Sequence, residues 1–423
     1  MLRRPPYDVV VVGLGLAGMT AGLAAAEQGA NVLVLGKGYG TTHFRSGTID
    51  VLGYVEGQRT RSPRQALPGF VAAHPDHPYA LVGVHLEPAL ELLRAVTADQ
   101  GLSLRGSLDA NQLVATAAGT LRPTCMAPRS LAGGWAGARV LAAGFEGYRD
   151  FDPELFAAVF PAAAAEHDLD VTVRAVRLTV PQLARRHLDG LSLARLFEQR
   201  TFRAQLLEEL GPRLGDATLV AFPAVLGMER AAAVHDELER ELGMGVVELP
   251  TLPPSVPGMR LQRALEAALR RRGARIQVGA TARLERWRGR ATMLEVASAA
   301  HPTRMALRAV VLAAGGLASG GLEVEQAGTI TETVAGLPVA APPGAPSDEW
   351  FRDAFLGPVG QSAGLAGLRV DERMRPLAAS GSVAGDNVFA AGGILAGAQR
   401  PVERSADGLA CVTGYVAGRE AAA

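Results

Sequence analysis

The chain has 423 residues, of which 48% are hydrophobic, and this composition excludes a disordered chain and leaves room for two domains. Its 42 basic and 42 acidic residues cancel, so no excess charge points to a nucleic acid or to an anionic membrane as partner. Only Cys125 and Cys411 are present, which excludes a disulfide framework and a cysteine-based metal site.

The first predicted elements are a strand, a glycine-rich turn, a helix and a second strand, all within residues 9–38. The run VVVVGLGLAG places Gly13, Gly15 and Gly18 at the spacing of a dinucleotide-binding fingerprint. Gly13 permits the tight turn, Gly15 lets the backbone approach a pyrophosphate, and Gly18 lets the helix pack closely on the strand. We expect the free N–H groups at the helix N-terminus, beginning with Leu16 and Ala17, to face that anion.

One part of the fingerprint is missing. An acidic residue normally ends the second strand and holds a ribose hydroxyl, but this chain has Gly36 at that position. Lys37 follows it, either as a contact to a phosphate or as an exposed side chain. The adenosine end of a bound nucleotide would therefore lose a hydrogen bond to a charged group, which is worth about 1.5–3 kcal/mol.

The N-terminal apolar run also has to be weighed as a targeting segment. Residues 9–26 are uncharged, but the glycine spacing is better explained by a buried strand and a packed helix than by a membrane span. The pair Arg3-Arg4 precedes this run, but no believable signal cleavage site follows. We expect a cytoplasmic protein.

The middle of the chain is predicted to contain loops, helices and short strands. The glycine-punctuated residues 38–53 should form a loop that crosses the cofactor. Residues 60–80, rich in Pro and His, are predicted to be a surface connection, and residues 85–100 an amphipathic helix. Short alternating runs from about 105 to 180 favour antiparallel strands.

From residue 190 onwards, helices and apolar strands follow one another. The proline-rich residues 249–258 are predicted to be non-helical. The other predicted elements are helices at roughly 193–210, 229–242 and 259–271, strands at 218–222 and 275–278, a hairpin-like region, strands beginning at 309 and 387, and a helix from about 406.

Glycine-rich strand ends therefore occur at the start of the chain, near residue 313 and near residue 392. The predicted fold class is α/β, with a discontinuous Rossmann-like nucleotide-binding domain and an inserted α+β cap or substrate domain. The nucleotide-binding domain would comprise residues 1–60, 258–330 and 380–423, the inserted domain 61–257, and a returning connection 331–379.

Three strand-end glycine motifs in this order resemble the two-dinucleotide-binding-domain flavoproteins of the fumarate reductase and succinate dehydrogenase type. Four segments, HFRSGTIDVLG, GTLRPT, LPTLPPSVPGMRLQ and FAAGGILAG, resemble one family more specifically. That family is the B subunit of anaerobic glycerol-3-phosphate dehydrogenase, and the resemblance spans nearly the whole chain.

The resemblance implies a respiratory complex, in which a catalytic flavoprotein (the A subunit) and an iron–sulfur, membrane-attached protein (the C subunit) accompany the B subunit. The implied reaction converts glycerol 3-phosphate to dihydroxyacetone phosphate and passes the electrons to quinone. Membrane contact is then expected only through these partners, peripheral to the inner membrane. FMN is the flavin given for the B subunit in such a family.

Cofactor contacts are expected at all three glycine motifs. FAD is expected because the fingerprint is built to recognise a pyrophosphate, with FMN as the alternative. Gly393 stands where related flavoproteins carry an acidic residue for the ribityl hydroxyls. The predicted contacts beyond the fingerprint, Gly36 and Lys37 are Ala313, Ala314 and Gly315 near the adenine or pyrophosphate, Gly392 and Gly393 near the ribityl chain, and Thr42, Ser46 and Gly47 near the isoalloxazine ring.

Oxidation of a phosphorylated alcohol would need a general base and cations for the phosphate. His43 and Arg260 are predicted as catalytic residues, and Arg45 and Arg122 as substrate-binding residues. By the family resemblance, His43 also lies near a histidine that is covalently attached to flavin, so covalent attachment is a hypothesis. No metal is expected, because no two histidines or carboxylates recur at convincing ligand spacing.

Two alternatives stay open. The absent acids at Gly36 and Gly393 motivate an electron-relay or structural subunit with weak or no flavin binding. A dehydrogenase that uses nicotinamide explains less of the sequence, because it does not account for the third motif at residues 389–393.

Overall fold

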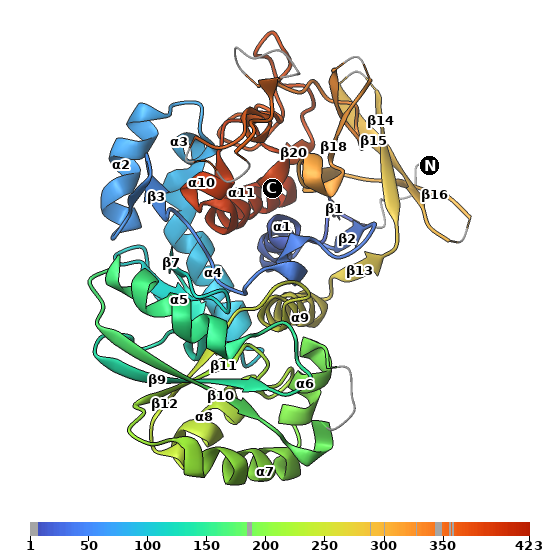
Figure 1. Ribbon diagram of the computed structural model, residues 1–423. Helices are drawn as coiled ribbons and strands as arrows, with labels where there is room; N and C mark the ends of the chain where they lie inside the picture. The colour runs from blue at the N-terminus through green and yellow to red at the C-terminus, as the bar shows by residue number, and fades with distance from the viewer. Residues whose placement is uncertain are drawn as a thin grey trace.

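The computed structural model describes the chain from residue 7 onwards, except residues 184–187, 288, 300, 327, 343–348, 355–356 and 358. Its main sheet has five parallel strands in the order β13-β2-β1-β17-β20 (Figure 1). These strands are β1 (Val9–Val12), β2 (Val32–Gly36), β13 (Arg275–Val278), β17 (Ala309–Leu312) and β20 (Val388–Ala390). The parallel order fits the Rossmann-like architecture predicted from the sequence.

Helix α1 (Leu16–Glu27) lies between α11 (Ala406–Ala422) and α9 (Val256–Arg271) (Figure 1). The approach of α11 to α1 depends on two glycines one turn apart. A Cβ atom on Gly414 or Gly418 would lie 2.3 or 2.2 Å from a backbone carbonyl oxygen of α1. Gly414 and Gly418 therefore let α11 pack directly against α1, and this packing helps to set the position of the fingerprint turn.

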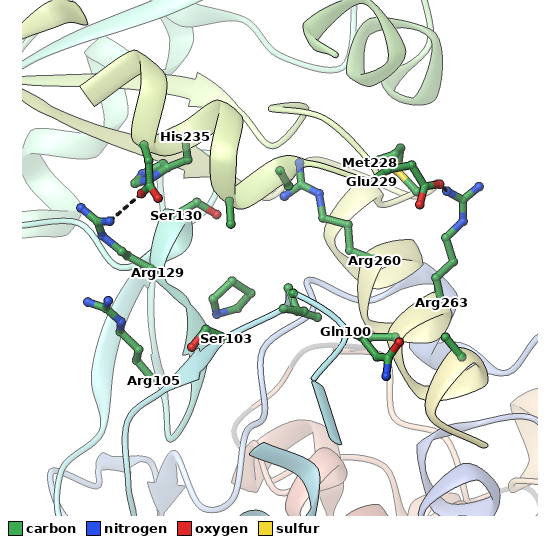
Figure 2. Close-up of a pocket in the computed structure, with 18 of the residues that line it drawn as sticks. Gln100, Ser103, Arg105, Arg129, Ser130, Met228, Glu229, His235, Arg260 and Arg263 are labelled. Atoms are coloured by element: carbon green, nitrogen blue, oxygen red, sulfur yellow. Dashed lines mark hydrogen bonds and ion pairs between the residues drawn. The ribbon is translucent and has the colours of Figure 1, made fainter. Parts of the chain in front are cut away.

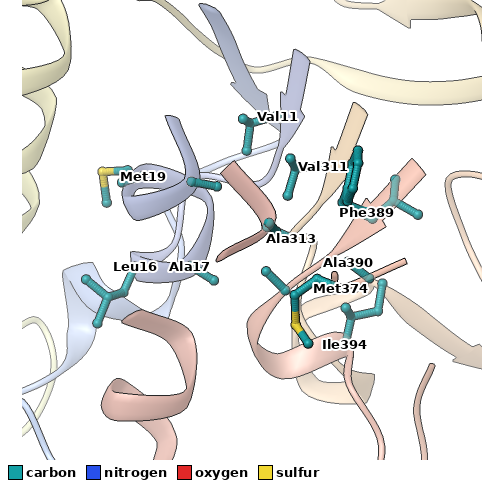
Figure 3. Close-up of a cluster of buried hydrophobic side chains, with 14 of the residues drawn as sticks. Val11, Leu16, Ala17, Met19, Val311, Ala313, Met374, Phe389, Ala390 and Ile394 are labelled. Atoms are coloured by element: carbon teal, nitrogen blue, oxygen red, sulfur yellow. The ribbon is translucent and has the colours of Figure 1, made fainter. Parts of the chain in front are cut away.

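A buried apolar cluster lies where the ends of β1, β17 and β20 meet α1 (Figure 3). Val11, Met19, Val311, Phe389 and Ile394 belong to it, and each is at most 3% exposed. Burial of each such side chain contributes roughly 1.5–3 kcal/mol. The motifs at the ends of β1, β17 and β20 therefore project from a rigid platform.

A second parallel sheet, ordered β10-β9-β11-β12, forms the other large layer (Figure 1). Its strands are β9 (Ala138–Phe145), β10 (Val171–Leu178), β11 (Leu219–Pro223) and β12 (Gly245–Leu249). The connecting helices are α5 (Pro153–Ala165), α6 (Gly190–Phe197), α7 (Arg200–Leu210) and α8 (Ala231–Leu242).

The prediction of antiparallel strands is wrong for β9 and β10. The helix α5 connects them, so β10 returns in the same direction as β9. At the edge of its sheet β10 is only partly buried, and it therefore shows an alternating pattern that is also typical of an antiparallel strand.

Antiparallel pairing does occur in smaller units. The hairpin of β6 (Gln112–Ala115) and β7 (Leu121–Thr124) confirms the prediction for that stretch. The predicted hairpin-like region is the antiparallel sheet of β14 (Thr281–Trp287), β15 (Arg290–Ala297) and β16 (Thr303–Ala306). The remaining two-stranded pairs are β3 (Tyr54–Val55) with β4 (Gln58–Arg59), β5 (Leu104–Arg105) with β8 (Ala127–Pro128), and β18 (Leu322–Val324) with β19 (Ile330–Glu332).

The connection predicted at residues 60–80 is largely at the surface, but it contains two helices instead of an irregular segment. These are α2 (Pro63–Ala73) and α3 (Pro78–Val82), followed by α4 (Leu86–Ala98) at the predicted place. His77 is only 1% exposed and its Nε2 lies 3.2 Å from Glu403, in the short helix α10 (Arg400–Glu403).

Helix α9 begins three residues earlier than predicted, at Val256. Pro257 lies in its first turn, where the missing N–H has no helical acceptor, so the proline starts the helix instead of breaking it. The hydroxyl of Ser255 caps the turn by accepting a hydrogen bond from Gly258 N at 3.5 Å.

Two hydrophobic clusters accompany the two sheets. The second cluster draws its members from residues 115–259, and the first from residues before 127 and after 260. Residues 70–108 belong to the first cluster, although the predicted inserted domain begins at 61. The domain boundaries stay a prediction. In the part of the chain that the structure describes, no helix is long and apolar enough to cross a membrane.

Candidate flavin site and its polar surroundings

The fingerprint turn joins β1 to α1 at the carboxyl edge of the main sheet. Gly13 has a φ of +132°, and a Cβ there would lie 2.1 Å from the carbonyl oxygen of Ala313. A Cβ on Gly18 would lie 2.0 Å from the carbonyl oxygen of Gly13. Close backbone packing between β1, α1 and β17 therefore requires both glycines, whatever ligand binds.

Gly15 differs from the other two fingerprint glycines. Among the described residues, a Cβ there would meet only the Cα of Gly40, at an ordinary contact distance of 3.9 Å. Packing does not demand a glycine at this position, but the close approach of a ligand to the backbone does. Gly15 is also the N-cap of α1 and provides no side-chain cap, so the first turn keeps free donors.

The loop after β2 crosses this turn, and its contact with the cofactor stays a prediction. The Thr42 hydroxyl, in the 3-10 turn η1 (Thr41–Phe44), accepts a hydrogen bond from Leu16 N at 2.8 Å. Ala17 and Gly18 follow Leu16 in the first helical turn, where no intrahelical acceptor exists for their N–H groups. Thr42 thus covers one amide of the cradle, and the next two can still receive an anion.

The space where a carboxylate side chain would lie at the end of β2 is filled by another residue. A Cβ on Gly36 would lie 3.1 Å from Cγ of Leu14, whose side chain is buried against this position. The side chain of Leu14 therefore occupies the space beside the strand end. Lys37 is exposed directly after it.

The other two glycine motifs meet each other and the fingerprint. Gly315 and Gly392 have φ values of +84° and +76°, which favour glycine. A Cβ on Gly316 would lie 2.7 Å from the carbonyl oxygen of Gly393, and a Cβ on Gly392 would lie 2.6 Å from the Cβ of Ala17. Ala313 is buried and Ala314 half-buried between them. The three motifs thus converge as the sequence predicted.

The fit of this site to a flavin nucleotide is good at the phosphates and poorer at the sugars. Gly15 and the amides of Ala17 and Gly18 form a cradle that a Cβ would fill. At Gly393, a Cβ would lie only 3.2 Å from Gly316 N, so the tight backbone packing leaves little room for a carboxylate side chain. Sugar hydroxyls would have to find backbone groups or water instead.

Beyond the cradle, the crossing loop carries a network that we call the loop cluster: Ser46, Thr48, Asp50 and Arg122. Arg122 of β7 donates from Nη2 to both hydroxyls, at 2.6 Å for Thr48, and its Nη1 lies 3.4 Å from Asp50 Oδ2. Because both terminal nitrogens are engaged inside the protein, the predicted role of Arg122 in substrate binding is not favoured. Gly47, at φ +71°, packs against Pro257.

The loop is tied to α11 by a second ion pair. Arg45 Nη1 lies 3.2 Å from Asp407 Oδ1, and Asp407 Oδ2 accepts a hydrogen bond from Asp50 N at 3.4 Å. Burial raises the pKa of Asp407 to about 6, and the nearby Asp50 carboxylate adds to that rise while Arg45 opposes it. The side chain of Arg45 is 33% exposed, so this guanidinium can still reach a ligand.

His43 lies on the same loop but faces α9. Its ring stacks on Tyr39 with centroids 4.7 Å apart, and its buried Nδ1 has no hydrogen-bond partner among the residues that the structure describes. Burial lowers the pKa of His43, with a smaller opposing effect from Glu266. The imidazole is therefore neutral near pH 7 and able to accept a proton.

Arg260 is committed to a buried ion pair. Its Nη1 and Nη2 donate to the two carboxylate oxygens of Glu248 at 2.6 and 2.8 Å, and its Nε donates to the carbonyl of Gly227 at 2.8 Å. Burial alone would raise the pKa of Glu248, but the charge and hydrogen bonds of Arg260 outweigh it and hold that pKa below its ordinary value. This geometry ties α9 to β12 and does not favour the predicted catalytic role.

A cavity of about 480 Å³ lies beside α9 (Figure 2). Helix α9 turns Gly258 and Gln262 towards the loop and the fingerprint, whereas Arg260 and Ala264 line the cavity on another face. Five arginines and three carboxylates line it, and most are already paired with each other or with neighbours. The cavity is thus separated from the fingerprint by α9.

One side-chain group beside this cavity has the composition of a metal site. His235, Asp236 and Glu239 bring their ligand atoms within 4.8 Å of one another. Arg129, however, pairs with both carboxylates, and His235 Nε2 donates to the carbonyl of Val246 at 2.8 Å. These partners satisfy the group without a metal ion.

Sequence reasoning missed Thr48, Asp50, Asp407 and Glu248 as parts of these networks. Thr48 and Asp50 stand in the HFRSGTIDVLG segment that carries the family resemblance, and this position was the available signal. Asp407 begins α11 and Glu248 lies inside an apolar strand, so neither shows a partner in the sequence.

The chain belongs to the family described as FAD binding domain, whose model matches residues 8–407. This match supports FAD, rather than FMN, as the cofactor of the site. Within this class the chain belongs to the family of the B subunit of anaerobic glycerol-3-phosphate dehydrogenase, which confirms the resemblance drawn from the sequence. Two relatives carry that identification.

The protein of this name from Pectobacterium atrosepticum is 33% identical over 406 residues, which are 92% of each chain. A Halobacterium salinarum protein, named as a probable B subunit of the same enzyme, is 32% identical over 98% of this chain and 97% of its own. Both names describe one subunit of a larger assembly.

Two solved structures are also similar. The open conformation of a flavocytochrome c3 fumarate reductase has a TM-score of 0.46 and 12% identity, covering 98% of this chain and 78% of its own. A 3-ketosteroid Δ1-dehydrogenase from Sterolibacterium denitrificans has a TM-score of 0.45 and 14% identity, covering 98% and 99%. At these scores we draw no conclusion from either.

Proposed function

We propose that this chain is the FAD-bearing B subunit of an anaerobic glycerol-3-phosphate dehydrogenase. In that role it oxidises glycerol 3-phosphate to dihydroxyacetone phosphate and passes the electrons towards quinone. The proposal depends mainly on the surroundings of Gly15. Packing leaves room for a side chain at this position, but the chain has a glycine there, and the neighbouring amides form a cradle for an anion. The names of the relatives supply the substrate class.

Within this proposal each polar group has a role. A bound flavin supplies the hydride acceptor. The amides of Ala17 and Gly18 hold its phosphate, and Arg45, partly exposed, offers a cation to the substrate phosphate. His43, with its lowered pKa, is the general base for the substrate hydroxyl. The second sheet acts as the cap over the site.

The partners follow from the family. We propose that the A and C subunits of the enzyme join this chain, and that the complex meets the inner membrane through the C subunit. The nucleotide-binding regions 1–60, 258–330 and 380–423 would then face the partner that exchanges electrons with the flavin.

A single methyl group tests the cofactor assignment. We expect Gly15→Ala to fold normally, because the added Cβ meets only an ordinary contact, and to lose flavin because the methyl fills the cradle. The measurements are the flavin absorbance per chain, the mass of the flavin released by acid, and the thermal unfolding temperature. Gly38→Ala is the matched control, since nothing lies within 4 Å of its added Cβ.

Purified wild-type chain without stoichiometric flavin would contradict the proposal. Acid precipitation that releases all of the flavin would exclude covalent attachment at His43. Turnover of glycerol 3-phosphate with a dye acceptor by the isolated chain would exclude a pure relay role.

A second candidate function has its own supporting observations. Thr42 already engages the Leu16 amide, Leu14 fills the space beside Gly36, and the Gly316 backbone packs on Gly393. These contacts favour an electron-relay or structural subunit that binds flavin weakly. A Kd for FAD well above the concentration of the protein in a titration would support this candidate over the first.

A further inference from the structure

The loop cluster contains a directed row of hydroxyl groups. The oxygens of Ser46 and Thr48 lie 2.8 Å apart, and the hydroxyl of Thr48 donates to Asp50 Oδ1 at 3.2 Å. Ser46 is half-buried at the cofactor loop, whereas Thr48 and Asp50 are only 2% and 1% exposed. The row therefore leads from the predicted flavin site into the buried interior.

Arg122 gives this row its direction. A guanidinium only donates hydrogen bonds, so both hydroxyl oxygens accept from Arg122 Nη2. Each hydroxyl hydrogen is then free for the next acceptor, from Ser46 to Thr48 and from Thr48 to Asp50. The position of Arg122 is fixed by its ion pair with Asp50.

We propose that Ser46, Thr48 and Asp50 form a proton path that serves the flavin site, with Arg122 as its positioning residue. This inference rests on the proposed function. When the substrate O–H bond breaks, its proton binds Ser46 Oγ, the hydrogen of Ser46 passes to Thr48, and that of Thr48 passes to Asp50 Oδ1. The C–H electron pair leaves as hydride to the flavin, the electron pair of the former O–H bond forms the carbonyl, and no other reactant is needed.

The charges around Asp50 make this destination reasonable. The charged and titratable groups that face it are Arg122 on β7, Asp407 at the start of α11, Arg45 in the loop and the buried thiol of Cys125. Two guanidinium groups balance two carboxylates in this set. A proton on Asp50 adds one positive charge to this set, which would offset the negative charge that a bound flavin gains on accepting a hydride.

His43 lies apart from this row of hydroxyl groups. Its ring faces Tyr39 and α9, and its charged neighbours are Glu266 and Arg263. In the proton path, Ser46 accepts the proton of the substrate hydroxyl in place of His43, which is the base in the proposed function above.

Thr48→Val and Thr48→Ser form a matched pair for the test. Valine keeps the shape of the side chain and removes the hydroxyl, while serine keeps the hydroxyl. In the flavin-loaded protein mixed with glycerol 3-phosphate, we expect Thr48→Val to slow the bleaching of flavin absorbance about 100-fold, within the range for general acid–base catalysis. Thr48→Ser should stay within about threefold of the wild type, and both variants should keep their flavin.

A second readout does not depend on the rate. Infrared difference spectra of reduction should show the C=O stretch of a newly protonated carboxyl group in the wild type, and Asp50→Asn should remove it. The solvent deuterium isotope effect on bleaching should shrink in Asp50→Asn and persist in Thr48→Ser.

Each outcome decides the matter. Wild-type bleaching by Thr48→Val, or a carboxyl band that survives in Asp50→Asn, overturns the proton path and leaves the proposed function standing. A wild-type protein that binds no flavin, or whose flavin glycerol 3-phosphate does not reduce, overturns both. If Thr48→Val does not fold, the infrared test on Asp50→Asn and the rate of Thr48→Ser still decide.

Discussion

The two parallel sheets of this protein have similar connections but different strand ends. In the main sheet, the strands lead into glycine motifs at Gly13, Gly315 and Gly392, each with a positive φ. In the second sheet, the strands end in large buried side chains, namely Phe145, Leu178, Pro223 and Leu249. The rings of Phe145 and Phe222 lie parallel there, with centroids 6.1 Å apart.

This difference shows what turns a parallel sheet into a nucleotide site. Crossover helices direct donors towards the carboxyl edge in both sheets. Only the main sheet removes side chains from that edge, so that backbone amides stay accessible. In the second sheet the same edge is packed, and its one strongly polar feature, Glu248, is used internally by Arg260. The following predictions test this contrast.

The largest loss of stability is expected when a side chain is added beside the carboxyl edge of the main sheet. Gly18→Ala places a Cβ 2.0 Å from a backbone carbonyl oxygen, so the strand or the helix has to shift. We expect a loss of more than about 4 kcal/mol of unfolding free energy, or no folded protein. Chemical denaturation measures it.

The control in the second sheet is Gly245→Ala, at the first residue of β12. Its added Cβ would lie 2.9 Å from Cδ1 of Leu219, which is the end of a flexible side chain. We expect a loss of about 1 kcal/mol, typical of a single substitution. Equal losses at the two glycines would show that contact with a backbone oxygen does not set the cost at Gly18.

The next largest effect is expected from the ion pair that ties the second sheet to α9. Glu248→Leu leaves the buried guanidinium of Arg260 without its partner, which should reduce the unfolding free energy by about 3–5 kcal/mol. Urea denaturation gives the value. Asp236→Asn, at the exposed pair with Arg129, is the control and should change stability by less than about 1 kcal/mol.

A double variant separates pairing from packing at this site. Glu248→Leu combined with Arg260→Met replaces both charges with apolar side chains, and we expect it to recover most of the loss. If the double variant is as unstable as Glu248→Leu, the loss comes from the other acceptor roles of Glu248, towards Ser130 and the amide of Leu226.

The sequence predicted the main sheet well because its signals are local. The apolar runs at residues 9–12 and 309–312 and the glycines after them specify strand ends by periodicity and conformational freedom. The direction of β9 and β10 was not predictable in this way, because it depends on where α5 packs. Alternation in an edge strand looks the same in either direction.

The candidate site shows the same limit at the level of side chains. The glycine motifs were predicted because backbone geometry needs them, and the structure brings them together. Arg122 was predicted to bind the substrate and Arg260 to be catalytic, but each is paired inside the protein, with Asp50 and Glu248, which lie 72 and 12 residues away in the chain. No spacing rule reveals such a partner, so a free cation and a buried ion pair look alike in the sequence.

A moderate effect on the pH dependence of stability is expected from Asp407, which lies in α11 beside the main sheet. Burial raises its pKa to about 6 in the folded protein, from about 3.9 in the unfolded chain. The folded state therefore binds this proton more tightly, so the stability from this group is fully present below pH 4 and is lost as the pH rises through 6.

Asp407→Asn removes this pH dependence. Between pH 4 and pH 7, the wild type should lose about 2 kcal/mol of unfolding free energy more than the variant does. Urea denaturation at both pH values measures the difference. Parallel stability curves for the two proteins would show that Asp407 does not titrate in this range.

The smallest effect is expected where the cradle lacks its ribose carboxylate. Gly36→Glu alone would meet Leu14, so the change is paired with Leu14→Ala, which clears the space beside the strand end. If an adenosine ribose lies at the end of β2, the restored carboxylate should tighten FAD binding by about 1.5 kcal/mol, roughly tenfold in Kd.

Fluorescence titration with FAD gives the value, and Leu14→Ala alone is the control. FMN has no adenosine ribose, so its Kd should not change. An equal gain in affinity for FMN would mean that the carboxylate acts on the fold and not on the ribose. A gain for FAD alone would extend the contrast between the two sheets to the sugar of the nucleotide. The edge of the main sheet would then accept a side chain only where the ligand supplies a hydrogen-bond partner for it.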